Sequence, residues 1–410
     1  MTKTAIKKWI LALSASAALV VAGCSSSHQS ISGGNATTYT IGLLTDRTGP
    51  IADPISDPTN AVKATIAMFN AEGYHLELAV ADAQSSPAGA ITAAHQLVQQ
   101  DHVFAVDLFS ALGFAAEPYL ASVGIPVIGT DLDGGPAWTT DKNFFSATGA
   151  PNLKQVTTTT GSLLELLGAQ EFSAIGYSIS TSSSDAARGA ALSAQNAGIK
   201  VGYLNTQFPF NSTNVAPAVI AMRNAGVDSF VGEVEESTSL AIISGARQQG
   251  IHFKAAILGT GYGDITQQGT ATEKDAAGAY FSLGYEPLEL HTAATQRFAK
   301  AMQIYGNIPA AHIDSNDYLA YMSIDSFVSG LKAAGHNPNQ AQFIDAMLNL
   351  HNYNGAGLYG THTIGFALDQ RGQSAGPDNC EWLIQWTGTT NILVKGAEPI
   401  CGSVIPGKTA

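Results

Sequence analysis

The sequence is poor in charge, and basic residues are scarcer than acidic ones. Its 410 residues include 19 Lys and Arg against 32 Asp and Glu, which gives a formal net charge of −13. A surface for duplex nucleic acid needs clustered Lys and Arg against the phosphates, so we exclude nucleic acid as a partner. Hydrophobic residues make up 45% of the chain, which supports more than one core and about two to four domains.

Catalytic and cofactor motifs are scarce as well. The sequence contains no HExxH and no CxxC, and its ten histidines are scattered. Residues 176–180 lack the final Gly of a nucleophile elbow, and the glycines of residues 259–263 lack the spacing of a dinucleotide-binding loop. We therefore expect no enzyme, no cofactor and no metal site.

The first 24 residues have the pattern of an export signal. Three lysines precede an apolar run at 9–22, and its 14 residues fall short of the ~20 that span a bilayer. The run ends in Val-Ala-Gly-Cys24, which resembles the lipobox of bacterial lipoproteins. This resemblance implies a signal peptide at 1–23, cleavage before Cys24 and diacylation of its sulfur. The alternative is an ordinary signal peptide in which Cys24 is incidental.

The residues after the signal favour a tether outside the cytoplasmic membrane. Removing residues 1–23 deletes three lysines and no acids, so the formal charge falls from −13 to −16. That charge disfavours direct adhesion to anionic lipid, which leaves the acyl chains on Cys24 as the membrane contact. Residues 24–38 are small and polar, as in a flexible linker. The predicted location is extracytoplasmic or periplasmic, on a lipid anchor.

Two cysteines remain once Cys24 carries lipid. Cys380 and Cys401 stand 21 positions apart near the C-terminus. An even pair in an oxidising compartment predicts a disulfide. The alternative, a metal pair, lacks further Cys or His at ligand spacing.

A repeated pattern of helix, glycine and strand predicts a parallel α/β fold. Four Ala-rich stretches each end in a Gly and run into a short β-branched segment, at Gly124, Gly198, Gly226 and Gly250. Further strands are predicted at 39–45, 75–82, 103–108, 382–386 and 392–394, and helices at 57–70 and 86–100. Alternation over about 370 residues exceeds one doubly wound sheet, so we expect two lobes with a ligand cleft between them.

The order of several short motifs resembles one known family, the type I periplasmic binding proteins, in the branch that binds Leu, Ile and Val for ABC importers. The resemblance covers about residues 39–394. Its motifs are Ile41-Gly-Leu-Leu-Thr-Asp-Arg-Thr-Gly-Pro50, Asp82 followed by Pro87, Ser110 to Pro118 running into Gly124-Ile-Pro-Val-Ile, Tyr321 before Gly335, and Phe366-Ala-Leu-Asp-Gln-Arg-Gly372.

The resemblance implies two doubly wound parallel-sheet lobes joined by a three-strand hinge. Lobe I would comprise residues 39–149 and 285–355, and lobe II residues 150–284 and 356–400, followed by a tail at 401–410. The hinge crossings would lie near Thr148-Gly149, Gly284-Tyr285 and Gly355 to Gly360.

The resemblance also places ligand-binding residues in lobe I. Ser110, with the amide of Ala111, matches the family serine loop that takes a ligand carboxylate. The loop containing Asp131 and Asp133 matches the one that offers a backbone carbonyl and a Thr hydroxyl, with Asp133 where Thr or Ser is usual. Asp53, in the loop after Gly49-Pro50, is a further candidate. A helix cap or a solvated loop is the alternative role for each of these side chains.

In lobe II the chain departs from the family pattern. Ser182 and Ser183 replace the Tyr-Gly pair at a helix start, so an aromatic contact is missing. Glu235 and Glu236 follow a strand at a position where the family often has an aromatic residue. The family's acidic residue that pairs with a ligand ammonium corresponds to a position near Gly261, beside Tyr262, where this chain has no acid.

These departures argue against a simple branched-chain amino acid as the ligand. Buried carboxylates accept hydrogen bonds from hydroxyls and amines but repel other carboxylates. We therefore expect a small polar ligand rich in donors, such as an amide, a polyol, an amine or another amino acid. The predicted function is the solute-binding lipoprotein of an ABC importer, with permease subunits as partners. A sensory lipoprotein of the same fold, and a secreted hydrolase using Ser178 or an acid pair, are the alternatives.

Overall fold

The computed structural model describes residues 37–52, 57–132, 134–150, 152, 154–210, 212, 214–267, 269–372 and 377–410. Cys24, Asp53 and Asp133 therefore lie outside the described residues, as do the predicted signal peptide and most of the tether. Within these ranges, no helix has both the length and the apolar character that a membrane crossing requires.

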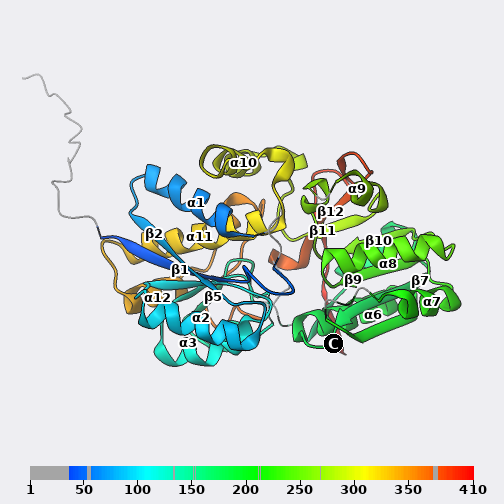
Figure 1. The fold of residues 1–410 in the computed structure, drawn as a ribbon, viewed down its shortest axis with the longest axis horizontal. Coiled ribbons are helices and arrows are strands. Elements are labelled where there is room, and N and C mark those ends of the chain that lie inside the picture. The colour runs from blue at the N-terminus through cyan, green and yellow to red at the C-terminus, as the bar shows by residue number, and fades with distance from the viewer. Residues whose placement is uncertain are drawn as a thin grey trace, which may run out of the picture. The chain divides into compact units, whose positions relative to one another are not determined.

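The first lobe is built on a five-stranded parallel sheet in the order β2-β1-β3-β4-β5 (Figure 1). The strands are β1 (Tyr39–Thr45), β2 (Leu76–Asp82), β3 (Ala105–Phe109), β4 (Val127–Gly129) and β5 (Phe144–Ser146). The connecting helices are α1 (Thr59–Ala71), α2 (Pro87–Gln99), α3 (Glu117–Val123) and α4 (Ala137–Thr140), with a short 3-10 turn η1 (Gly113–Ala115).

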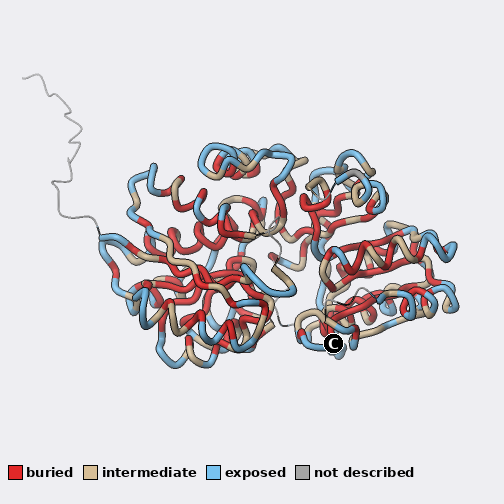
Figure 2. The backbone as a smooth tube through the Cα atoms, in the orientation of Figure 1, coloured by how far each residue is buried: buried red, intermediate tan, exposed pale blue. Residues whose placement is uncertain are grey.

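Side chains of β1 alternate between two hydrophobic layers. Ile41 and Leu43 pack with residues of α1 and of the later helices α10 (Ala293–Gly306), α11 (Ser315–Ala334) and α12 (Gln340–Leu348). Leu44 packs on the opposite face with α2 and α3. Figure 2 shows the central strands buried, the edge strand β2 partly exposed and the outer faces of these helices exposed. The sheet is thus covered on both faces, as a doubly wound parallel sheet requires.

The second lobe contains a larger, mixed sheet in the order β13-β12-β11-β10-β9-β7-β8. Its parallel part comprises β7 (Glu171–Tyr177), β8 (Lys200–Phe208), β9 (Ser229–Glu233), β10 (Ala255–Leu258) and β11 (Tyr280–Leu283). Its helices are α5 (Thr159–Leu166), α6 (Thr181–Asn196), α7 (Ala216–Ala225), α8 (Glu236–Gln248) and α9 (Thr270–Asp275). The predicted two-lobed α/β fold is confirmed, with antiparallel β12 (Cys380–Trp386) and β13 (Asn391–Leu393) added at one edge.

Most of the predicted helix ends and strands are confirmed. Gly124 and Gly226 cap their helices with φ values of 67° and 69°, in the left-handed region that a side chain disfavours. Ser86 caps α2 by accepting a hydrogen bond from the N–H of Gly89 at 3.0 Å. The predicted strand at Ile251–Phe253 is wrong, because these residues form a connection and β10 begins only at Ala255.

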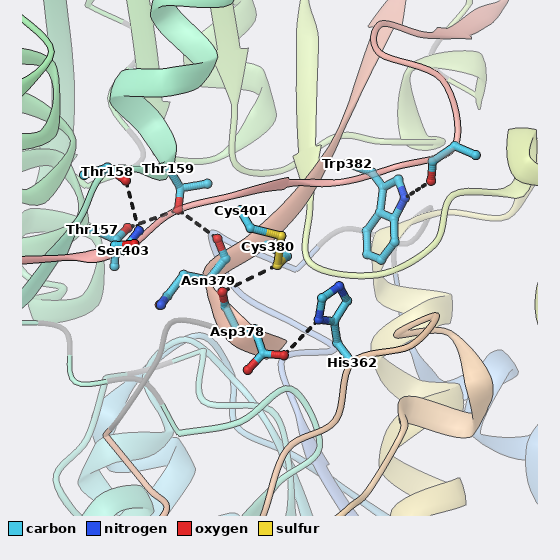
Figure 3. Close-up of a disulfide and its surroundings, with 11 residues drawn as sticks. Thr157, Thr158, Thr159, His362, Asp378, Asn379, Cys380, Trp382, Cys401 and Ser403 are labelled. Atoms are coloured by element: carbon cyan, nitrogen blue, oxygen red, sulfur yellow. Dashed lines mark hydrogen bonds and ion pairs between the residues drawn. A yellow bond between two sulfur atoms is a disulfide. The ribbon is translucent and has the colours of Figure 1, made fainter.

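The C-terminal segment is fixed by a covalent bond and by strand pairing. Cys380 on β12 lies opposite Cys401 on β14 (Ile400–Cys401), and the predicted disulfide joins them (Figure 3). Residues 401–410, which the sequence predicts as a tail, contain β15 (Val404–Thr409), antiparallel to β6 (Gln155–Thr157).

Segments that the sequence predicts as hinge crossings lie beside one another. The N–H of Glu286 donates to the carbonyl of Leu358 at 2.7 Å, and the hydroxyl of Tyr359 donates to the carbonyl of Ala147. The remaining short helical turns are η2 (Asp264–Gln267), η3 (Leu288–Leu290), η4 (Ala310–His312), η5 (Gly355–Gly357) and η6 (Pro377–Asn379).

A carboxyl group lies in the core of the first lobe. Asp107 is fully buried on β3, and its Oδ1 accepts a hydrogen bond from Ser323 Oγ of α11 at 2.7 Å. Among the described residues, its Oδ2 has no hydrogen-bond partner. Burial raises the pKa of Asp107 to about 7, and the hydrogen bond from Ser323 only partly offsets this.

Asp107 should therefore make the protein less stable as the pH rises. A carboxyl group whose folded-state pKa is raised contributes stability that is complete below its ordinary pKa of 3.8 and is lost as the pH passes through about 7. Urea unfolding measured at several pH values gives the free energy of unfolding against pH. Across this window, that free energy should fall with pH by about 1.4 kcal/mol per pH unit less in Asp107→Asn than in the wild type. Asp345→Asn, on the exposed face of α12, should keep the wild-type slope, and an unchanged slope in Asp107→Asn would contradict the prediction.

Candidate ligand-binding site

Most of the sequence-predicted binding residues follow the carboxyl end of a parallel strand. In the first lobe Ser110 and Ala111 follow β3, and Asp131 follows β4. In the second lobe the predicted residues follow β7, β9 and β10, at Ser182, Ser183, Glu235, Glu236 and Tyr262. Ligands of open α/β sheets bind at this edge, because strand ends, loops and helix N-termini meet there.

The hydroxyl of Ser110 is hydrogen-bonded to a carboxylate of the same chain. Its hydroxyl donates to Asp46 Oδ2 at 2.7 Å, and its oxygen accepts the N–H of Leu112 at 3.2 Å. Ala111 is half-buried in the turn that follows. The Ser110 hydroxyl proton is therefore not directed at a ligand carboxylate, and a negative group lies directly behind it.

Asp46, which directly follows β1, was not predicted as a site residue. Its Oδ1 accepts the N–H of Ser85 at 2.9 Å. Burial raises the pKa of Asp46, and the nearby charge of Asp82 adds to this, although the hydrogen bonds from Ser110 and Ser85 act against it. Its position after a parallel strand was the available sequence signal.

Asp82 fixes the loop that follows β1. It accepts hydrogen bonds from the hydroxyl of Thr48 and from the N–H groups of Gln84, Arg47 and Thr48, at 2.6 to 3.2 Å. Burial by itself raises the pKa of Asp82, but these bonds together lower it. The carboxylate thereby holds two strand-end loops together.

The loop after β4 offers an uncommitted hydroxyl. Thr130 is 2% exposed, and its Oγ1 has no hydrogen-bond partner among the described residues. The neighbouring Asp131 accepts the N–H of Gly134 at 3.0 Å, and its own N–H donates to Ser146 Oγ at 3.2 Å. A buried hydroxyl without a partner is costly, so a ligand that bonds to Thr130 would relieve that cost.

The two serines at the start of α6 have different roles. Ser183 Oγ accepts the N–H of Tyr177 at 2.7 Å and donates to the carbonyl of Glu233, so it joins the ends of β7 and β9. Ser182 Oγ instead donates to the carbonyl of Leu132 at 3.2 Å, which connects a second-lobe helix to a first-lobe loop.

The acidic residues after β9 lie at different depths. Glu235 is half-buried at the N-cap position of α8, whereas Glu236 is 6% exposed and lies against Gly261. Glu233 ends β9, and burial raises its pKa to about 7, with the nearby Glu381 carboxyl raising it further.

Tyr262 packs in an aromatic cluster. It is 2% exposed, its ring contacts Phe281 and Tyr318, and its hydroxyl donates to Glu289 Oε2 at 2.8 Å while accepting the N–H of Leu288. Both the ring and the hydroxyl of Tyr262 are therefore used within the protein.

A cavity of about 370 Å³ lies between residues of the two lobes. Asp131 and Thr139 line it from the first lobe, and Thr181 and Asp185, at the start of α6, line it from the second lobe. Arg371, which was not predicted, also lines it. Further lining residues are Gly134, Gly135, Pro136, Asn152, Lys154 and Gly372.

Arg371 is a buried cation held by backbone carbonyls. Its guanidinium donates to the carbonyls of Phe366, Trp138 and Asp141 at 2.7 to 3.2 Å. Burial lowers its pKa to about 10, so it stays charged at neutral pH. Asp185 bonds to Arg188 at 2.5 Å. The cavity wall thus contains both acidic and basic groups.

One phosphate-loop pattern in the sequence is not a phosphate site. Residues 402–409, Gly-Ser-Val-Ile-Pro-Gly-Lys-Thr, match the spacing GxxxxGK[ST]. Such a loop must connect a strand to a helix, but here Val404–Thr409 is the strand β15. The Gly402 N–H donates to the carbonyl of Asn379 rather than facing an open cradle.

The hydrogen bonds of Ser183 predict a structural role that can be tested. Ser183→Ala leaves the N–H of Tyr177 and the carbonyl of Glu233 without this partner, so we expect unfolding free energy to fall by about 1–3 kcal/mol. The matched control is Ser182→Ala, which removes a single bond and should cost less than about 1 kcal/mol. Equal losses in urea denaturation would contradict these roles.

The chain resembles solved solute-binding proteins over most of its length. A benzoate-bound solute-binding protein of an ABC transporter from R. palustris is 16% identical, with a TM-score of 0.69, covering 90% of this chain and 98% of that chain. The leucine-binding protein LivK of Thermotoga maritima is 14% identical, with a TM-score of 0.70 and coverages of 88% and 99%. The isoleucine-bound LivJ of Streptococcus pneumoniae is 18% identical, with a TM-score of 0.67 and coverages of 90% and 99%.

At these identities the solved structures show a shared fold. A search of curated proteins finds no match. The sequence profile described as "Periplasmic binding protein" matches residues 38–390. The chain therefore belongs to the periplasmic binding protein family.

Proposed function

We propose that this protein captures a small polar solute outside the cytoplasmic membrane and delivers it to the permease of an ABC importer. The observation that carries the proposal is the cavity lined by residues of both lobes, among them Asp131 after β4 and Thr181 after β7. A cavity of about 370 Å³ has the size of a small-molecule site. Two solved structures that share this fold hold small carboxylates, namely benzoate and isoleucine.

The acceptor groups of the site support a ligand that donates hydrogen bonds. Asp46 already takes the Ser110 hydroxyl proton, so this position favours a donor over a second carboxylate. The cavity adds the carboxylates of Asp131 and of Asp185, which is paired with Arg188, and one amine, that of Lys154, while the donors of Arg371 are directed to backbone carbonyls. Amides, polyols, amines and donor-rich amino acids fit this distribution better than an apolar amino acid.

Lobe closure supplies the signal that a permease can recognise. A ligand shifts an open–closed equilibrium only through its different affinity for the two states. Contacts such as Ser182 Oγ to the Leu132 carbonyl join elements of both lobes, and a ligand bonded to both would add to them. A sensory role for the same closed state differs only in the receiving partner.

The ligand class can be tested by a thermal-shift screen. Amides, polyols, amines and polar amino acids should raise the melting temperature of the purified protein more than leucine or valine does. Thr130→Val should lower affinity for the best ligand about 5–10-fold, because it removes one hydrogen bond, yet leave the ligand-free protein at least as stable.

The matched control for Thr130→Val is Thr92→Val, on the exposed face of α2. This variant should change neither the affinity for the ligand nor the stability of the ligand-free protein. If leucine or valine gives the largest shift, the acceptor-based argument fails. If Thr130→Val binds as tightly as the wild type, Thr130 does not contact the ligand.

The membrane anchor is a second prediction. Cys24→Ser removes the sulfur that would carry the acyl chains, and the mature charge of −16 gives no attraction to anionic lipid. We expect the variant in the soluble extracytoplasmic fraction and the wild type in the membrane fraction. The measurement is cell fractionation with immunoblotting, and persistent membrane association of the variant would overturn the anchor.

A further inference from the structure

A histidine lies beside the disulfide in the second lobe (Figure 3). One ring nitrogen of His362 and the sulfur atoms of Cys380 and Cys401 all lie within 4.8 Å of one another. His362 belongs to the loop after η5, and it precedes Cys380 by 18 positions and Cys401 by 39, which is not a standard metal-ligand spacing. The third donor that a metal pair lacks in the sequence is supplied by the fold.

A carboxylate orients the imidazole. Asp378 Oδ2 lies 2.8 Å from His362 Nδ1, which leaves Nε2 as the nitrogen for another partner. Metal-binding histidines almost always use their second nitrogen in this way, because a carboxylate fixes the ring and raises its basicity. The Asp378–His362 pair therefore has the arrangement that metal-binding histidines use, and it does not depend on the cysteines.

The two sulfur atoms are held by strand pairing. Cys380 and Cys401 are opposite residues of β12 and β14, with their Cα atoms 3.9 Å apart. In a tetrahedral zinc site with Zn–S bonds of about 2.3 Å, two thiolates lie about 3.8 Å from each other. Once the bond between them is reduced, rotation of the two cysteine side chains on this backbone can place the sulfurs at that distance, so that both bind one ion.

We propose that reduction of the Cys380–Cys401 disulfide creates a Cys₂His site for a soft divalent metal ion such as zinc. A dithiol reductant transfers two electrons to the disulfide and is itself oxidised to a disulfide, while the two cysteine sulfurs each take up one proton. Metal binding then releases these two protons to solvent, and the thiolates and His362 Nε2 become ligands. Water fills the fourth position, as in zinc sites with three protein ligands.

The same geometry gives the site a redox gate. Cys401 is exposed, so a dithiol can reach it, whereas Cys380 is 1% exposed. The oxidised sulfurs have no charge to offer and bind metal weakly. The reduced sulfurs are the soft ligands that zinc and cobalt(II) prefer, so one two-electron step switches the site on.

The test uses the full chain in a Cys24→Ser background, so that only two thiols are present. After reduction with a phosphine and transfer to anaerobic buffer, cobalt(II) should bind one ion per chain with thiolate-to-metal charge-transfer absorption, and zinc should displace it. The oxidised protein should show no such absorption. Absence of the absorption in the reduced protein would overturn the proposal.

Two variants and one control test the roles of His362 and Asp378. His362→Ala should weaken cobalt binding at least tenfold, and Asp378→Asn should weaken it about 10–100-fold with the absorption retained. His351→Ala is the matched control, since His351 bonds to Gln370 and is not part of the cluster. If His362→Ala binds as tightly as the parent, the site is a dithiol only and the proposal fails.

Folding is followed by circular dichroism in every sample. Should reduction unfold the chain, zinc should restore the native spectrum of the parent but not of His362→Ala. Should zinc restore both or neither, His362 is not a ligand and the proposal is wrong.

Discussion

The direction of the parallel strands is the constraint on which the binding site depends. Because β1, β3 and β4 are parallel, each is followed by a crossover that returns the chain to the amino ends of the strands. The residues directly after all three strands therefore lie at the same end of the sheet, the carboxyl end. Asp46, Ser110 and Thr130 therefore follow the same ends of neighbouring strands, although 84 positions separate the first from the last. The parallel strands of the second lobe obey the same rule, and the cavity includes residues from both sets of strand-end loops.

Local signals in the sequence predict the elements well where one segment decides the outcome. Tyr39–Thr45 is rich in β-branched and apolar residues and forms β1 over that range. Ser86-Pro87 both caps and starts α2, because the side chain accepts an N–H and proline needs none. Ile251–Phe253 has strand composition but no strand, since composition does not fix where pairing with β9 begins.

Pairings between distant segments could not be predicted. β15 finds its partner β6 nearly 250 residues away, and nothing in either segment specifies the other. The same limit applies to side-chain roles. Ser110 and Ser183 stand at the predicted strand ends, but their hydroxyls bond to Asp46 and to the carbonyl of Glu233, which only the fold brings near.

The commitment of these hydroxyls determines what remains for a ligand. Ser110, Ser183 and Tyr262 each use their polar atoms on neighbouring protein groups, so they stiffen the site and need no reorganisation when a solute arrives. Recognition then depends on the few groups with unused capacity, Thr130 above all, and on the acceptor oxygens around Asp46. The acceptor oxygens of Asp46 and Asp131 gain affinity from a solute that brings its own protons, and they disfavour one that presents a carboxylate to them.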